Sequence, residues 1–180
     1  LTYYMDTLDP TFLEKLSALL PADSFADGPP SGQYDDHGLR LAQPRFATQP
    51  VQGISAIKPG PQPDTFWALS DNGYATKWNS PDWRLAIYLF AASPQRKRVS
   101  LLRRIALTDP AQKFPWRLAN EEVPGRPLTG ADIDPESMVA MPDGSFWIGD
   151  EFGPWLLHFD AAGRLLAPPV DLPDPRAAHA

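Results

Sequence analysis

Most of the chain beyond residue 52 consists of short apolar runs that alternate with turn-forming residues. Four runs, GISAIKPG, TFWALSDNG, RLAIYLFAA and RVSLLRRIAL, follow one another within residues 53–107. After a polar interval over residues 108–130, the pattern returns in ESMVAM, SFWIGDE and WLLHFD. Runs of this length, bounded by Gly, Pro, Asn and Asp, predict β-strands.

The turns between these runs favour antiparallel strands. PDG at residues 142–144 separates two strand-like runs, and AAG at residues 161–163 ends the last one. Proline presets the first turn angle and glycine accepts a positive φ, so a Pro-Asp-Gly sequence predicts a hairpin. The 22 prolines and 12 glycines are also typical of a chain built from short elements. We therefore expect an all-β fold of successive meanders.

The two groups of strands resemble each other in sequence. Without gaps, FWALSDNG at residues 66–73 aligns with FWIGDEFG at residues 146–153, which places Asp71 over Glu151. Two four-stranded units with the same internal turns predict radial repetition, as in the blades of a β-propeller. The alternative is a β-sandwich in which Phe-Trp pairs recur by chance.

The N-terminus carries the one helical signal in the sequence. Asp9 and Pro10 form an N-cap with proline at the first helical position, and apolar residues recur at helical spacing up to Pro21. We expect residues 1–21 to be an extension with a short helix, and residues 22–180 to be the β domain.

Charge and composition exclude several function classes. A net charge of −6 argues against a general nucleic-acid binder, which needs clustered positive charge. The absence of cysteine excludes disulfides and thiolate zinc sites in this sequence. The sequence contains no run of about 18 apolar residues, which is the length that a membrane-spanning helix needs. The start at Leu1 fits an export signal already removed, although a sequence boundary would look the same.

Acidic residues gather where the predicted strands meet loops. Hard divalent cations such as Ca²⁺ take six to eight oxygen ligands in irregular geometry, so carboxylates from several blades suit them. Glu136 opens an apolar run, where a carboxylate is costly unless a cation or donors satisfy it. The predicted ligands, in decreasing order, are Glu136 and Glu151, then Asp71 and Asp150, then Asp132 and Asp134.

Three of these carboxylates also have a simpler interpretation. Asp150 and Glu151 would cap a turn in water if no ion were present. Asp134 precedes a proline, and Asp-Pro is a common turn signal.

Residues 130–172 carry a series of motifs in a specific order. An acidic D-x-E is followed by PDG, FW, GDE, GP and a D-x-x-G turn. This segment resembles the esterase-like activity of phytase family, known as the phytase-like domain. LPADSF, TQP, QGISAI and WALSDNGYATKWNS extend the resemblance over most of residues 20–173.

The resemblance implies a propeller, a periplasmic or extracellular location in bacteria, and hydrolysis of phosphate or other esters with Ca²⁺ or another divalent metal. A more distant likeness to calcium-dependent propeller phytases places Glu136 with Ser137, and Gly149 with Asp150 and Glu151, at that family's acidic positions. Family domains are longer than this chain, which would supply about half a propeller. The other half, or a second chain, is therefore an expected partner.

The same resemblance suggests residues for catalysis on a small-molecule ester. Beside the metal ligand Glu151, Lys77 is the first candidate to hold a substrate phosphate, and Arg84 is the second. The simpler interpretation of both is an exposed surface charge. Ser55 and Ser137 lack the G-x-S-x-G elbow of a serine esterase. Two alternatives remain open: a non-catalytic propeller with structural calcium, and a lactonase-like hydrolase.

Overall fold

The computed structural model describes residues 25–51, 53–93 and 98–173 of the 180-residue chain. Every regular element in these residues is a β-strand, which confirms the predicted all-β class. The strands form two four-stranded antiparallel sheets and one two-stranded ladder. The helix predicted between Asp9 and Leu20 lies outside the described residues, as does the predicted boundary at residue 21.

Both four-stranded sheets are meanders, in which neighbouring strands follow one another in sequence. The first sheet contains β3 (Ile54–Pro59), β4 (Thr65–Ser70), β5 (Ala86–Ser93) and β6 (Arg98–Ala106). The second contains β7 (Pro135–Ala140), β8 (Phe146–Asp150), β9 (Trp155–Phe159) and β10 (Val170–Asp171). In the ladder, β1 (Phe25–Ala26) pairs with β2 (Gln49–Pro50). The apolar runs form strands as predicted, whereas the short strand β10 was not indicated by them.

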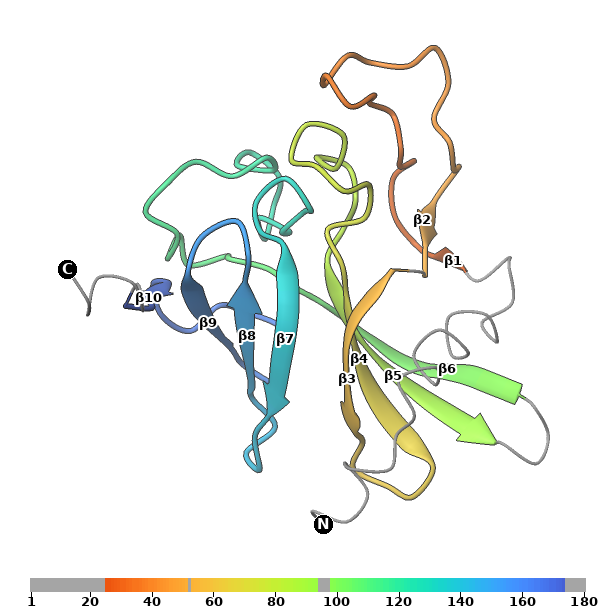
Figure 1. Cartoon of the computed structure of the whole chain (residues 1–180), viewed down its shortest axis with the longest axis vertical. Helices are drawn as coiled ribbons and strands as arrows, with labels where there is room; N and C mark the ends of the chain where they lie inside the picture. The colour runs from red at the N-terminus through yellow and green to blue at the C-terminus, as the bar shows by residue number, and fades with distance from the viewer. Residues whose placement is uncertain (1–24, 52, 94–97, 174–180) are drawn as a thin grey trace.

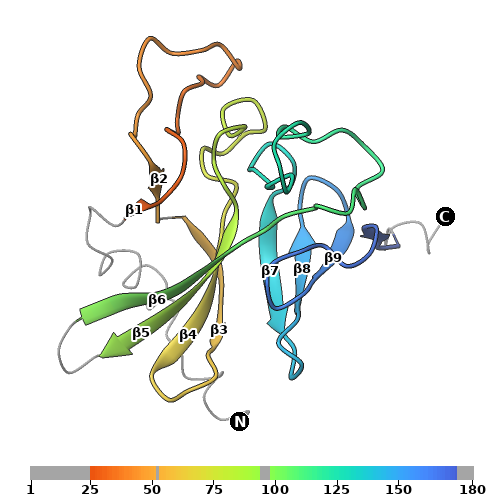
Figure 2. The same cartoon turned by 180° about the vertical axis from the view of Figure 1, so that it is seen from behind.

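The first strands of the two sheets lie closest to each other. β3 and β4 contact β7, and both sheets fan away from this line, as Figures 1 and 2 show from opposite sides. The long connection between β6 and β7 returns from the outer strand of the first sheet to the inner strand of the second. Within the described residues the sheets do not close into a ring, so the predicted propeller is not established by this arrangement.

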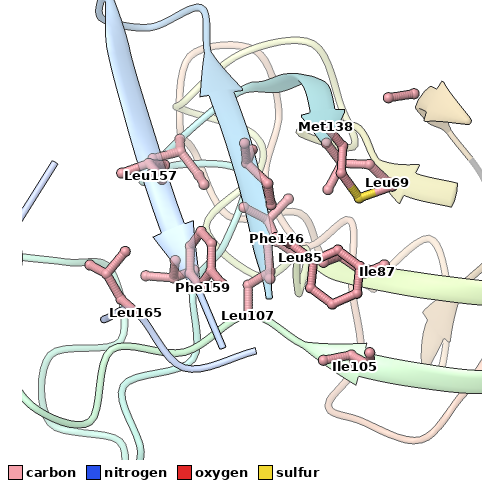
Figure 3. Packing of buried hydrophobic residues seen from close by; sticks show 14 of the residues in the cluster. Leu69, Leu85, Ile87, Ile105, Leu107, Met138, Phe146, Leu157, Phe159 and Leu165 are labelled. Atoms are coloured by element: carbon pink, nitrogen blue, oxygen red, sulfur yellow. The ribbon is translucent and has the colours of Figure 1, made fainter. Parts of the chain in front are cut away.

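The main hydrophobic core lies between the two sheets. Leu69, Leu85 and Ile87 from the first half of the chain join Met138 and Phe146 from the second in one buried cluster. Figure 3 shows these side chains meeting between the strands. Burial of this apolar surface fixes how the two sheets lie relative to each other.

Strand β8 shows the predicted alternation of faces. Phe146 and Ile148 are buried toward the core, whereas Trp147 and Gly149 are only partly buried on the opposite face. Because side chains alternate along a strand, this alternation leaves Asp150 on the core side at the end of the strand. The second sheet therefore places a buried carboxylate, that of Asp150, at the end of β8.

Candidate functional site

The two sheets present the ends of β4 and β8 through the same backbone arrangement. The N–H of Asp71, just after β4, donates to the carbonyl oxygen of Gly53 at 2.9 Å. In the second sheet the N–H of Glu151, just after β8, donates to the carbonyl oxygen of Asp134, also at 2.9 Å. The predicted equivalence of Asp71 and Glu151 thus holds at the level of hydrogen bonds.

A β-bulge accompanies each of these hydrogen bonds. The register shifts between Ile54 and Ala56 in β3, and between Pro135 and Ser137 in β7. The extra residue of the second bulge is Glu136. Bulges redirect side chains at strand ends, and this one leaves Glu136 exposed beside the carboxylates of neighbouring segments.

Three carboxylates from these segments form one group, which we call the carboxylate cluster: Asp71, Asp134 and Glu136. One oxygen from each lies within 4.8 Å of the others. Glu151 is close enough for its charge to raise the pKa of both Asp134 and Glu136. The structure therefore brings together two of the higher-ranked predicted ligands with Asp134, which ranked lowest, and places Glu151 beside them.

Asp134 is the most constrained member of the cluster. It is 7% exposed, and its Oδ2 accepts a hydrogen bond from Asn72 Nδ2 at 2.9 Å. Its Oδ1 is buried without a hydrogen-bond partner in the described part of the chain. Burial, followed by the charges of Asp71, Glu136 and Glu151, raises the pKa of Asp134 to about 7. Burying a carboxylate among other acids is costly unless a cation or hydrogen-bond donors satisfy it.

Asn72 connects the loop after β4 to the cluster. Its side chain is buried, with Nδ2 on Asp134 and Oδ1 accepting from the N–H of Ala75 at 3.1 Å. Gly130 packs so closely here that a Cβ would collide with the carbonyl oxygen of Asn72. The sequence shows Asn72 only as part of a turn-like SDNG, and its partner lies 62 residues away.

Asp150 and Asp132 position the backbone around the cluster. Asp150 Oδ1 accepts from the N–H of Asp134 at 2.6 Å, and Oδ2 accepts from the N–H of Gly153 at 3.0 Å. Asp132 accepts from the N–H groups of Ala119 and Thr129 at 2.7 and 2.8 Å. Burial raises the pKa of both carboxyls. Their oxygens are thus already engaged, unlike the free oxygen of Asp134.

The two predicted cationic residues lie in different surroundings. Lys77 is exposed, with Nζ 4.4 Å above the ring of Phe152, and its charge acts on Asp150. Arg84, which precedes β5, is half-buried, and burial followed by the charge of Arg104 lowers its pKa. Lys77 therefore lies near the carboxylate at the end of β8.

Comparison with known proteins supplies the family. A family model described as "Esterase-like activity of phytase" matches residues 49–179, a stretch that includes both sheets and all the carboxylates above. The chain belongs to this phytase-like family.

The phytase-like chain also has a curated relative. It is 28% identical to an "Uncharacterized secreted protein" of the fungus Arthroderma benhamiae, in an alignment that covers 56% of this chain and 26% of the relative. The chain thus spans about a quarter of that protein's length. No solved structure matches the phytase-like chain. In its described part there is no helix with the length and hydrophobicity needed to cross a membrane.

The carboxylate cluster fits the metal dependence that the phytase-like family suggests. Its donors are all oxygens, which hard divalent cations prefer over nitrogen or sulfur. The unpartnered Oδ1 of Asp134 lies buried among acids whose charges raise its pKa. A cation would satisfy that oxygen and offset the repulsion among the three groups.

A serine and a histidine also meet in this phytase-like chain, at the other end of β8. Ser145 Oγ lies 3.0 Å from His158 Nε2 and donates to Asp143 Oδ1 at 2.7 Å. The Asp143 carboxylate also accepts the N–H of Ser145 at 2.9 Å, which is the geometry of a side-chain-closed turn. In a serine hydrolase the acid orients the histidine rather than the serine. This contact therefore closes the β7–β8 turn.

Proposed function

We propose that this chain is part of a secreted, metal-dependent ester hydrolase that acts on phosphate esters. The observation that carries the proposal is the buried, unpartnered Oδ1 of Asp134 beside Asp71 and Glu136. Asp71, Asp134 and Glu136 would hold a Ca²⁺-type cation, with Glu151 at the edge of the same group. Secretion is supported by the relative described as a secreted protein.

The proposed architecture is a β-propeller in which the two sheets are successive blades. Three observations support it: the meander order of both sheets, the proximity of their first strands, and the repeated hydrogen bond and bulge at their ends. A longer protein would supply the remaining blades, since the relative is about four times longer than the aligned part. A structure of that longer protein with its sheets stacked in one sandwich would contradict this proposal.

The chain's own residues prepare the site in three ways. Asp150 accepts the N–H of Asp134 and fixes where that residue enters β7. Asn72 occupies one oxygen of Asp134 and leaves the other free for an ion. Lys77 offers an exposed ammonium group that would bind an anionic substrate oxygen. When bound, a divalent cation supplies positive charge for ester oxygens and promotes loss of a proton from water.

The test compares two acids of matched chemistry and different location. Asp134→Asn keeps the shape of the cluster residue, whereas Asp64→Asn alters an exposed acid in the turn between β3 and β4. Thermal unfolding is followed during a Ca²⁺ titration, because a ligand at about 100 times its Kd stabilises a fold by about 2.7 kcal/mol. We expect Ca²⁺ to stabilise the wild type and Asp64→Asn by an amount of this order. Asp134→Asn should show no such stabilisation.

Hydrolysis is measured in the same three proteins with p-nitrophenyl phosphate, with and without chelator. We expect activity that requires the metal and is lost in Asp134→Asn. Activity that ignores both chelator and Asp134→Asn would contradict metal-dependent hydrolysis. Stabilisation by Ca²⁺ without hydrolysis of phosphate, carboxylate or lactone esters would instead indicate a binding module with structural calcium.

A further inference from the structure

Two arginines project from the face of the first sheet that is turned away from the second sheet. Arg84 lies just before β5, and Arg104 lies in β6. Leu85, Ile87 and Ile105 belong to the buried cluster between the sheets. Because side chains alternate along a strand, the two arginines project to the opposite side. They therefore lie outside the core that joins the sheets.

A pair of alanines lies between the two arginines. Ala86 of β5 is in register with Ala106 of β6. Arg84 comes two residues before Ala86, and Arg104 comes two residues before Ala106. Because the two strands are antiparallel, the arginines stand on opposite sides of this pair. The methyl groups of the alanines are too short to separate long side chains that approach from both sides.

No acid of the described segments compensates the charge of either arginine. Among residues 25–51, 53–93 and 98–173, neither Arg84 nor Arg104 forms an ion pair within 4.0 Å. Burial, followed by the charge of Arg104, lowers the pKa of Arg84. Arg126, by contrast, is held by Asp109 at 2.9 Å and by Glu121 at 3.1 Å. The pair is thus a local excess of positive charge.

Arg104 also carries an unsatisfied donor. Its Nε is buried and has no hydrogen-bond partner in the described part of the chain. Burial raises the pKa of Tyr88, and the charge and a hydrogen bond of Arg104 act in the opposite direction. A buried donor without an acceptor is costly. Both arginines remain partly exposed, so a ligand can reach them from solvent.

The shape of the guanidinium group indicates which ligand fits. Each group presents its N–H donors as a planar fork that matches two oxygen acceptors. Two forks that approach from opposite sides can engage up to four oxygens. A tetrahedral ion such as phosphate or sulfate has four oxygens, whereas a carboxylate has only two.

We propose that Arg84 and Arg104 bind a free tetrahedral oxyanion, of the phosphate or sulfate type, above the Ala86–Ala106 pair. A dianion would compensate both positive charges, and the Nε of Arg104 would gain an acceptor. The site lies on the outer face of the first sheet and needs no metal. The inference therefore goes beyond the proposed function and does not depend on it.

The test measures phosphate binding to the 180-residue chain by calorimetry. Chelator is present throughout, so that no divalent metal holds the anion. Acetate at the same ionic strength is the comparison, because it can engage only one fork. We expect saturable binding of phosphate and of sulfate, and binding of acetate that is about tenfold weaker or less.

Three variants and one control assign the binding to the arginine pair. We expect Arg84→Gln and Arg104→Gln each to weaken phosphate binding about tenfold, because each removes one charged fork. Arg104→Lys keeps the charge without the fork, so its affinity should lie between those of the wild type and Arg104→Gln. Arg103→Gln should leave binding unchanged, because Arg103 is exposed and donates to the carbonyl oxygen of Ala161 in the second half of the chain.

Two results would overturn the site. The first is phosphate binding that is no tighter than acetate binding in the wild type, a comparison that holds even if a glutamine variant does not fold. The second is an equal loss of binding in Arg103→Gln and Arg104→Gln, which would show a general effect of net charge. Neither result bears on the Ca²⁺ titration of the carboxylate cluster, so the two proposals fail independently.

Discussion

The two sheets share one backbone plan and differ in the side chains placed on it. Each has a bulge in its first strand and an N–H donated across to the residue before that strand. The first sheet has Gly53 and Ser55 at the positions where the second has Asp134 and Glu136. Of these equivalent positions, only those in the second sheet carry acids.

This difference shows that the backbone plan shared by the two sheets fixes where side chains can meet. The residues that differ between the sheets decide whether carboxylates stand at those positions. The first sheet contributes a single carboxylate, Asp71, to the cluster. A Cβ on Gly53 would approach the Cβ of Asp71 at 3.4 Å, and its φ of +63° favours glycine. The absence of a side chain there keeps space beside Asp71 clear, while the second sheet fills the equivalent position with Asp134.

The two sheets also differ in what the tryptophan of each Phe-Trp pair packs against. Trp67 on the first sheet packs edge-on against Phe146 of the second, with centroids 5.1 Å apart. The equivalent Trp147 is partly buried like Trp67, but it stacks on His158 of its own sheet. Val139, on the same outer face, is 55% exposed. Within the described residues, Trp67 therefore packs between the sheets, whereas Trp147 and Val139 lie on the more open outer face of the second sheet.

The largest expected effect tests this difference in coverage. Phe146→Ala removes a ring that is 2% exposed between the sheets, and we expect it to lower the free energy of unfolding by about 3–5 kcal/mol. Trp147→Ala, one residue away on the open face, loses mainly its stacking on His158 and should cost about 1 kcal/mol. Urea unfolding measures both. Equal losses would show that the outer face is covered in solution.

A second prediction compares the last residues of β4 and β8. Asp150→Ala leaves the N–H groups of Asp134 and Gly153 without acceptors, and we expect a loss of about 2 kcal/mol. Ser70→Ala frees only the N–H of Ala86 and should cost about 1 kcal/mol. Thermal unfolding gives the two values. Faster hydrogen exchange at the Asp134 amide would link the loss to the freed donor, whereas unchanged exchange would argue against it.

Sequence reasoning succeeded where the signal is local. The strands and the face alternation around Trp147 follow from short-range patterns, and the equivalence of Asp71 with Glu151 follows from the FW repeat. Asp134 ranked low because Asp before Pro is a common turn signal, and its partner Asn72 is distant in sequence. The contact between the tilted rings of Trp116 and Trp155 joins a polar interval to a strand, so no periodic pattern indicates it.

The ranking of Asp150 shows a second limit. A carboxylate that accepts backbone N–H groups and one that is free for an ion have the same sequence signature, namely an acid at the end of a strand. Only the hydrogen bonds separate these two uses.

The smallest expected effect is a change in stability that reverses its sign when Ca²⁺ is added. Burial, followed by the negative charges of Asp71 and Glu151, raises the pKa of Glu136. Without metal, Glu136→Gln relieves that repulsion, and because the group is largely exposed we expect a gain below about 1 kcal/mol. With saturating Ca²⁺ the same variant loses a ligand and should be less stable than the wild type.

Ser55→Ala, at the equivalent bulge, should change stability equally in both conditions. Melting temperatures with chelator and with Ca²⁺ measure the difference, and a Glu136→Gln effect of one sign in both would mean that this carboxylate does not hold the ion.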